Sequence, residues 1–115
     1  MVIIAALAFL GMGVLGLLAP ERISGLVGVP RLPLAARNEV RAVYGGFGVA
    51  MGILLGVTLF KQEIREGVIA AVSIALLGMA AGRVLSWLLD WRLPRFPALF
   101  LLIELVLGFG LLLSL

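Results

Sequence analysis

The sequence predicts an all-α integral membrane protein, folded as one four-helix bundle over the whole chain. Hydrophobic residues make up 63% of the 115 residues and charged residues only 13%, which is far from the composition of soluble domains. Four apolar runs each approach the roughly 20 residues that a membrane helix needs. Most charged residues lie in the short connections between these runs. A chain of this length is expected to form a single domain.

The residue types that are missing limit the chemistry of the protein. The chain has no Cys and no His, which excludes disulfides and thiolate metal sites and removes the commonest metal ligand and proton shuttle. We expect no metal and no cofactor, and an enzyme is the least favoured class because only carboxylate and tyrosine acid–base groups remain. The net charge of +3 comes from basic residues spread among the connections, which favours membrane lipids as partners and argues against nucleic acid.

The first predicted helix covers residues 1–19, an uncharged run. A secretory signal peptide is the competing interpretation, but the run has no basic start and no good cleavage site, so we expect a retained membrane helix. Residues 20–38 form the longest connection, and its three prolines and two glycines argue against a continuous helix. A short amphipathic turn in the headgroup layer and an irregular loop both fit this segment. Asn38 is expected to cap the next helix.

The remaining helices are predicted at residues 39–60, 67–89 and 98–115. A polar turn at residues 61–66 separates the second helix from the third, and a loop with interfacial aromatic residues at 90–97 leads into the fourth. The first and third connections hold most of the basic residues. The positive-inside bias therefore predicts that these connections face the cytoplasm of a bacterial cell, with the chain in the inner membrane and both termini outside.

Glycines recur at four-residue intervals in the second and third predicted helices. This spacing places them on one face of a helix, and on a membrane helix such a face lets a neighbouring backbone approach closely. We expect these glycines to pack against another helix of the chain, against a second copy in a homo-oligomer, or against a larger membrane complex. The residues assigned to helix packing are Gly45, Gly46, Gly48, Gly52, Gly56, Gly78 and Gly82.

Two ionisable residues, Arg83 and Glu104, fall inside predicted helices, where charges are expensive and tend to mark functional sites. Arg83 lies seven residues before Asp90 and Glu104 lies seven residues after Pro97, so each is about 10 Å from the same loop. Equal depth predicts an ion pair in which one guanidinium satisfies both carboxylate oxygens. With the polar residues that enter from the same membrane side, the predicted ligand-binding cluster is Glu39, Arg41, Tyr44, Arg83, Asp90 and Glu104.

The polar cluster has several interpretations. In the leading one, Arg41 and Arg83 bind the anionic or carbonyl head of a small amphipathic ligand, such as a lipid or a quinone, and the three acids orient the arginines. In the structural interpretation the cluster only holds the helices in register, because a paired buried charge is tolerated. Two further hypotheses are an accessory subunit that docks its glycine stripe at residues 48–56 on a larger partner, and a proton-coupled transporter with Glu104 as the carrier.

The segments Glu39–Gly46, E-V-R-A-V-Y-G-G, and Gly82–Asp90, G-R-V-L-S-W-L-L-D, resemble a bacterial family of small four-helix membrane proteins known as a domain of unknown function, number 4345. The resemblance extends over nearly the whole chain and includes the proline-containing first connection and an acid in the last helix, here Glu104. It implies four membrane helices and no established activity, and it points to the residues of the polar cluster. The family pattern has a glycine after the aspartate where this chain has Trp91, so the turn is expected to differ.

Overall fold

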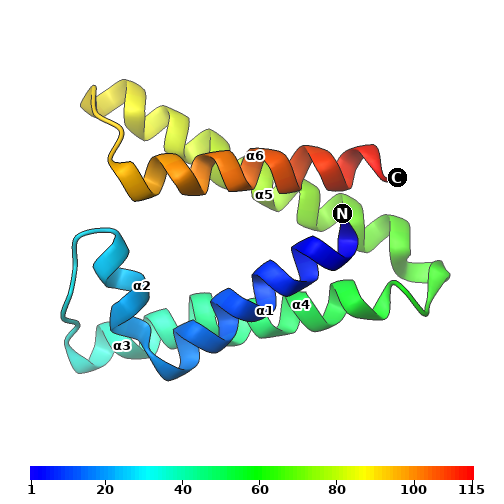
Figure 1. Cartoon of the computed structure of the whole chain (residues 1–115), viewed down its shortest axis with the longest axis horizontal. Helices are drawn as coiled ribbons and strands as arrows, with labels where there is room; N and C mark the ends of the chain where they lie inside the picture. Colours follow the sequence, from blue (N-terminus) through cyan, green and yellow to red (C-terminus); the bar gives the residue numbers. More distant parts are fainter. The chain divides into compact units, whose positions relative to one another are not determined.

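The computed structural model describes residues 1–115, and all its regular elements are helices (Figure 1). This confirms the all-α prediction. The chain divides into two compact units, Val2–Phe60 and Lys61–Leu115, the second of which also includes Met1. Three helical segments are long and apolar enough to cross a membrane, namely Leu34–Val57, Gln62–Asp90 and Arg95–Leu113. The assembly of both units into one four-helix bundle stays a prediction.

The first unit opens with two helices joined at a sharp bend. Helix α1 spans Val2–Leu18 and α2 spans Pro20–Leu26, and their axes differ in direction by 112°. Pro20 cannot continue α1 because it has no N–H, but it suits the first turn of a new helix. The backbone N–H of Leu32, in the loop after α2, donates a hydrogen bond to the carboxylate of Glu21 in α2 at 2.8 Å. The connection after α1 is therefore a short helix followed by a closed loop.

The next helical segment begins before its predicted start. It consists of α3 (Leu34–Val40), the π-helix η1 (Arg41–Gly46) and α4 (Phe47–Val57), which follow one another without a break. The expectation that Asn38 caps this segment is wrong, since the residue before the first turn is Pro33, with extended φ and ψ of −61° and 164°. The sequence L-A-A-R after this proline consists of good helix formers, so the helix starts as soon as the proline allows.

Helix α1 lies antiparallel to η1 and α4, and glycines bring the two backbones together (Figure 1). A Cβ atom added to Gly48 would lie 2.9 Å from Cα of Gly13. One added to Gly16 would lie 2.8 Å from the backbone nitrogen of Gly45. A Cβ atom added to Gly52 would likewise lie 2.9 Å from a backbone carbonyl oxygen of α1. The helices of this unit therefore pack backbone against backbone, as small residues permit in membrane proteins.

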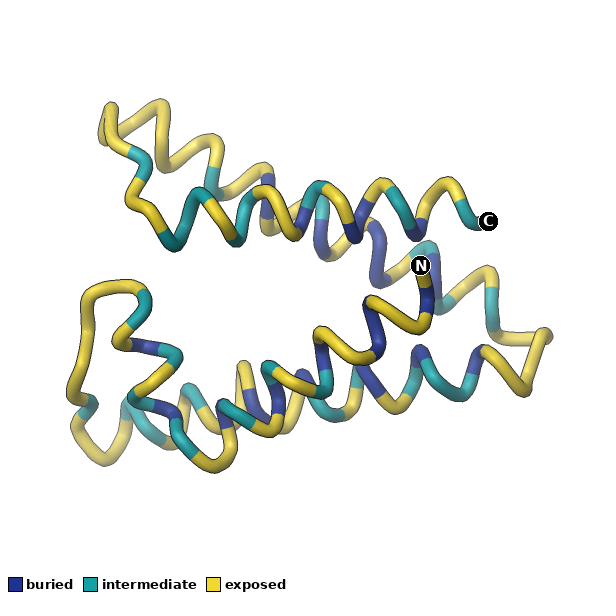
Figure 2. The backbone as a smooth tube through the Cα atoms, in the orientation of Figure 1, coloured by how far each residue is buried: buried dark blue, intermediate teal, exposed yellow.

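The second unit is a helical hairpin of α5 (Arg65–Asp90) and α6 (Arg95–Leu113), preceded by the short 3₁₀ helix η2 (Gln62–Ile64). Buried residues recur only in the part of the hairpin away from the α5–α6 connection, from Ile69 to Ala80 on α5 and from Glu104 to Leu111 on α6 (Figure 2). The guanidinium of Arg65 donates to the backbone carbonyl of Ser114 at 3.0 Å, which satisfies a free acceptor at the end of α6. The apolar core of this hairpin comprises Ile69, Val72, Leu76, Ala80, Leu107 and Leu111.

The outward faces of the helices are also apolar. Large hydrophobic side chains are exposed on every long helix, and the exposed fraction reaches 79% at Leu18 and 86% at Leu113. Soluble monomers rarely expose extended apolar patches, whereas a membrane helix places such side chains against lipid. The surface therefore fits the membrane character that the length and hydropathy of the helices indicate.

The connection after α5 begins with an unusual backbone. Trp91 has φ of 56° and ψ of 20°, the left-handed conformation, and its N–H donates to the carbonyl of Trp87 at 2.8 Å. This geometry is the common way to end a helix, and glycine is the usual residue there. A residue with a side chain pays about 1–2 kcal/mol for it. The turn thus keeps the shape that a glycine would take, although a tryptophan occupies the position.

We expect Trp91→Gly to raise the free energy of unfolding by about 1 kcal/mol relative to Trp91→Ala. Both substitutions remove a ring from a residue that is 87% exposed, so only the relief of the left-handed backbone distinguishes them. Thermal unfolding of both variants in the same detergent, followed by circular dichroism, measures the difference. Equal unfolding temperatures would show that this turn carries no strain.

Candidate functional site

An ion pair joins the two long helices of the second unit. Arg83 on α5 donates from Nε to Oε1 of Glu104 on α6 at 2.7 Å and from Nη2 to Oε2 at 3.1 Å. The exposed fraction of the side chain is 6% for Glu104 and 26% for Arg83. Two parallel charge-assisted hydrogen bonds fix the orientation as well as the distance of the groups. The carboxylate is thus buried with both oxygens satisfied.

An aromatic ring adds to the support of the guanidinium. Cζ of Arg83 lies 5.3 Å from the ring centroid of Phe100, within the range of a cation–π interaction. Phe100 precedes Glu104 by one helical turn, so both residues occupy the same side of α6. These contacts use Nε, Nη2 and one face of the guanidinium. The N–H groups of Nη1 make no hydrogen bond to the protein and are left for another acceptor.

A hollow of about 580 Å³ adjoins this arginine, bordered by the C-terminal half of α5 and the connection to α6. Its volume lies in the range of about 300–1,000 Å³ that small-molecule sites occupy. A Cβ atom added to Gly82 would meet no atom within 4 Å, so the glycine leaves this wall open. The polar part of the lining consists of Arg83, Ser86, Asp90 and Arg92, and Met79 and Trp87 contribute to its apolar part.

The predicted cluster is divided between the two units. Arg83 and Asp90 line the hollow, and Glu104 lies behind Arg83 as its ion-pair partner. The other three predicted residues belong to the first unit, at the end of α3 and in η1. Their proximity to the hollow stays a prediction.

Within the first unit, Arg41 has a partner of its own. Its Nε donates to the backbone carbonyl of Leu17 at 3.1 Å, at the end of α1, where the last carbonyls have no partner inside the helix. Arg41 therefore caps α1 across the interface with η1. Glu39 is exposed, and Tyr44 is 38% exposed in the π-helix.

The seven glycines assigned to packing have different surroundings. Gly45, Gly48 and Gly52 face α1 at close range. Gly46 has only one neighbour, a backbone oxygen 3.8 Å from an added Cβ. The remaining three, which are Gly56, Gly78 and Gly82, have no atom within 4 Å of an added Cβ.

Three residues that add a polar or a cation–π group to the candidate site did not appear in the predicted cluster. Ser86 donates its hydroxyl to Oδ2 of Asp90 at a long 3.5 Å, and its position four residues before Asp90 could have indicated this contact. Phe100 could have been found in the same way, four residues before Glu104. Arg92 is one of the basic residues of the third connection, which the sequence relates only to membrane topology, and its position gives no further indication that it lines a hollow.

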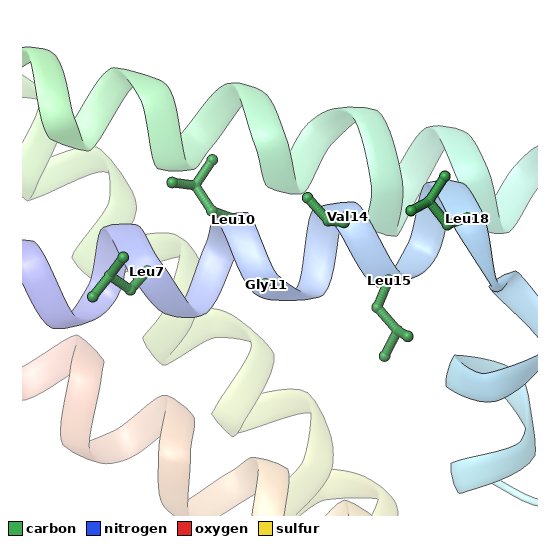
Figure 3. A pocket seen from close by; sticks show the side chains of 6 residues that line it. All are labelled: Leu7, Leu10, Gly11, Val14, Leu15 and Leu18. Carbon is green, nitrogen blue, oxygen red and sulfur yellow. The ribbon is translucent and has the colours of Figure 1, made fainter.

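A second groove runs along α1 and is wholly apolar (Figure 3). It has no polar side chain that could orient a ligand, whereas small-molecule sites usually combine an apolar lining with a few polar groups. We therefore do not regard it as the candidate site. The residues that line it are Leu7, Leu10, Gly11, Val14, Leu15 and Leu18.

Comparison with known proteins gives a family and no characterised relative. No curated protein and no solved structure matches the chain. The family described as Domain of unknown function (DUF4345) matches residues 1–115. Since the match covers the whole sequence, the protein whose α5–α6 hairpin holds the Arg83–Glu104 pair belongs to the DUF4345 family.

Proposed function

We propose that this protein is an integral membrane protein that binds a small amphipathic ligand, with the polar head of the ligand in the α5–α6 hollow. The observation that carries the proposal is the state of Arg83. Its guanidinium is held by a buried carboxylate on one edge and by Phe100 on one face, while Nη1 remains without a protein partner. A donor held in place before binding loses little entropy when a ligand arrives.

In the proposed membrane arrangement, the three long apolar segments and the bent α1–α2 pair provide four spans. Arg92 lies in the α5–α6 connection and Arg95 is the first residue of α6, and basic residues favour the cytoplasmic side. We therefore place this connection at the cytoplasmic face of a bacterial inner membrane, with both termini outside. The hollow then lies where lipid headgroups meet the hydrocarbon.

The proposed binding mode follows from the polarity of the lining. Arg83 donates to a carbonyl or anionic oxygen of the head, and Glu104 keeps the guanidinium oriented and compensates its charge. At the proposed depth in the membrane the surroundings have a lower dielectric constant than water, so this hydrogen bond is stronger than it would be in water. The apolar tail of the ligand runs along the exposed aliphatic faces of the hairpin, which lipid would otherwise cover.

We expect Gly82→Leu to abolish ligand retention without unfolding the protein. The leucine side chain would occupy the hollow, and the substitution itself meets no neighbouring atom within 4 Å. Helix propensity even favours leucine over glycine by somewhat less than about 1 kcal/mol. Native mass spectrometry of protein extracted in mild detergent measures retention as a co-purifying mass.

The matched control is Gly78→Leu. Gly78 lies one helical turn away on α5, has equally open surroundings and is not part of the lining. Loss of the bound mass in Gly82→Leu and its retention in Gly78→Leu is the expected pair of results. Wild-type protein without a bound mass, or a bound mass that is retained in Gly82→Leu, would contradict ligand binding in the hollow. Either result would favour the interpretation in which the ion pair only holds the helices in register.

A further inference from the structure

We infer that the ligand is a glycerophospholipid with an amine-bearing, zwitterionic headgroup. This inference rests on the proposed function and specifies its ligand. It follows from two properties of the hollow, the separation of its polar groups along α5 and the signs of the charges at its outer end.

The charged groups of the hollow lie at two depths. Arg83 forms the inner level, and Asp90 with Arg92 forms the outer level next to the connection. Asp90 follows Arg83 by seven residues on the helix, which corresponds to about 10 Å along the axis. A quinone has its oxygens on a single ring, so it can form hydrogen bonds at only one of these levels. A glycerophospholipid carries ester carbonyls below its phosphate and headgroup, so it offers polar groups to both.

The outer level carries both signs of charge. Within the α5–α6 unit the Asp90 carboxylate accepts only the long hydrogen bond from Ser86 and has no cation as a partner. Arg92, two residues further along, is exposed and makes no hydrogen bond in this unit. A phosphate beside Arg92 and an ammonium beside Asp90 would satisfy both groups at once. An anionic headgroup without an amine would leave the Asp90 carboxylate facing negative charge, which is unfavourable.

The inner level suits the glycerol region of the same molecule. The free N–H groups of Arg83 can donate to an ester carbonyl, which needs a donor and carries no charge. Trp87 lines the wall between the two levels, and tryptophan favours the interfacial zone where the glycerol backbone of a lipid lies. The order of groups along the hollow thus follows the order of groups along a zwitterionic phospholipid.

The two tryptophans of the chain allow a direct test. In a Trp91→Phe background, Trp87 is the only tryptophan, and its fluorescence reports occupancy of the hollow. The probes are dihexanoyl phosphatidylethanolamine, dihexanoyl phosphatidylglycerol and decylubiquinone, each titrated at a fixed detergent concentration. We expect the ethanolamine lipid to bind about fivefold more tightly than the glycerol lipid, the ratio that one partly exposed ion pair provides.

We expect Asp90→Asn to remove this preference while both lipids still bind. The control is Glu63→Gln, which neutralises an exposed acid at the opposite end of the hairpin and should leave the preference unchanged. Equal affinity for both lipids in the wild type, or a preference that survives Asp90→Asn, would overturn the headgroup assignment and leave ligand binding intact. Tighter binding of decylubiquinone than of either lipid would overturn the lipid assignment. If none of the three probes binds, the proposed function itself fails.

Discussion

Replacing Arg83 with alanine is expected to lower the free energy of unfolding by about 3 kcal/mol. The substitution leaves the carboxylate of Glu104, whose side chain is 6% exposed, without either of its donors. Removing one partner of a buried pair typically costs about 3–5 kcal/mol, because the other charge stays buried and uncompensated. The 26% exposure of the Arg83 side chain shows that solvent reaches the pair from one side, which places the effect at the lower end. Chemical denaturation of ligand-free protein in detergent micelles, followed by circular dichroism, measures it.

The two partners of the pair should respond differently. Glu104→Gln keeps one acceptor oxygen and leaves an arginine that can turn toward solvent, so we expect a cost of only about 1 kcal/mol. The double variant Arg83→Met with Glu104→Leu removes both charges and should recover most of the loss seen in Arg83→Ala, as apolar replacements of buried pairs often do. A double variant as unstable as Arg83→Ala would show that the uncompensated charge is not the cause.

Gly48→Ala is expected to lower the free energy of unfolding by about 3 kcal/mol, the upper end of the usual cost of overpacking. The added methyl group would lie 2.9 Å from Cα of Gly13 and 3.0 Å from the carbonyl oxygen of Phe9. These are backbone atoms and cannot rotate away, so α1 and α4 must move apart along their whole contact. Thermal unfolding of the variant in the same detergent as the wild type measures the loss.

Gly56→Ala is the matched control, because Gly56 follows Gly48 by eight residues in the same glycine stripe but has open surroundings. There the alanine should stabilise the helix by up to about 1 kcal/mol. Equal stability of the two variants would contradict the close approach of α1 and α4. The contrast also bears on the accessory-subunit hypothesis, since α1 already occupies the stripe at Gly48 and Gly52. A docking surface would have to use the open glycines instead.

Much of the fold was predictable because a long apolar helix can be recognised from the composition of one continuous segment. The apolar runs located each long helix without knowledge of any contact. The start of the second helix was missed because the expected cap at Asn38 and the charges beside it suggested a boundary. The determinant was Pro33, which ends the preceding loop. Capping preference is worth about 1 kcal/mol and does not outweigh four consecutive helix formers.

The candidate site was accessible from sequence only where it depends on local spacing. The equal distances of Arg83 and Glu104 from one connection bring them to the same depth on adjacent antiparallel helices, where the structure has their ion pair. The partner of Arg41 could not be predicted in this way, because the carbonyl of Leu17 is a backbone group, which every residue has. The hollow beside Gly82 could not be predicted either, because the spacing of glycines does not show whether a neighbouring helix packs against each of them.

The π-helix η1 has a consequence for how chain length can vary in this protein. The N–H of Phe47 reaches back to the carbonyl of Ala42, five residues earlier, so this turn holds one residue more than an α-helical turn. Deleting one residue inside Arg41–Gly46 would let the turn close as ordinary α-helix, with α4 still facing α1 as before. A deletion inside α4 would instead rotate everything on one side of it by about 100° and turn the glycines away from α1. Single-residue insertions and deletions in related chains should therefore concentrate in this one turn.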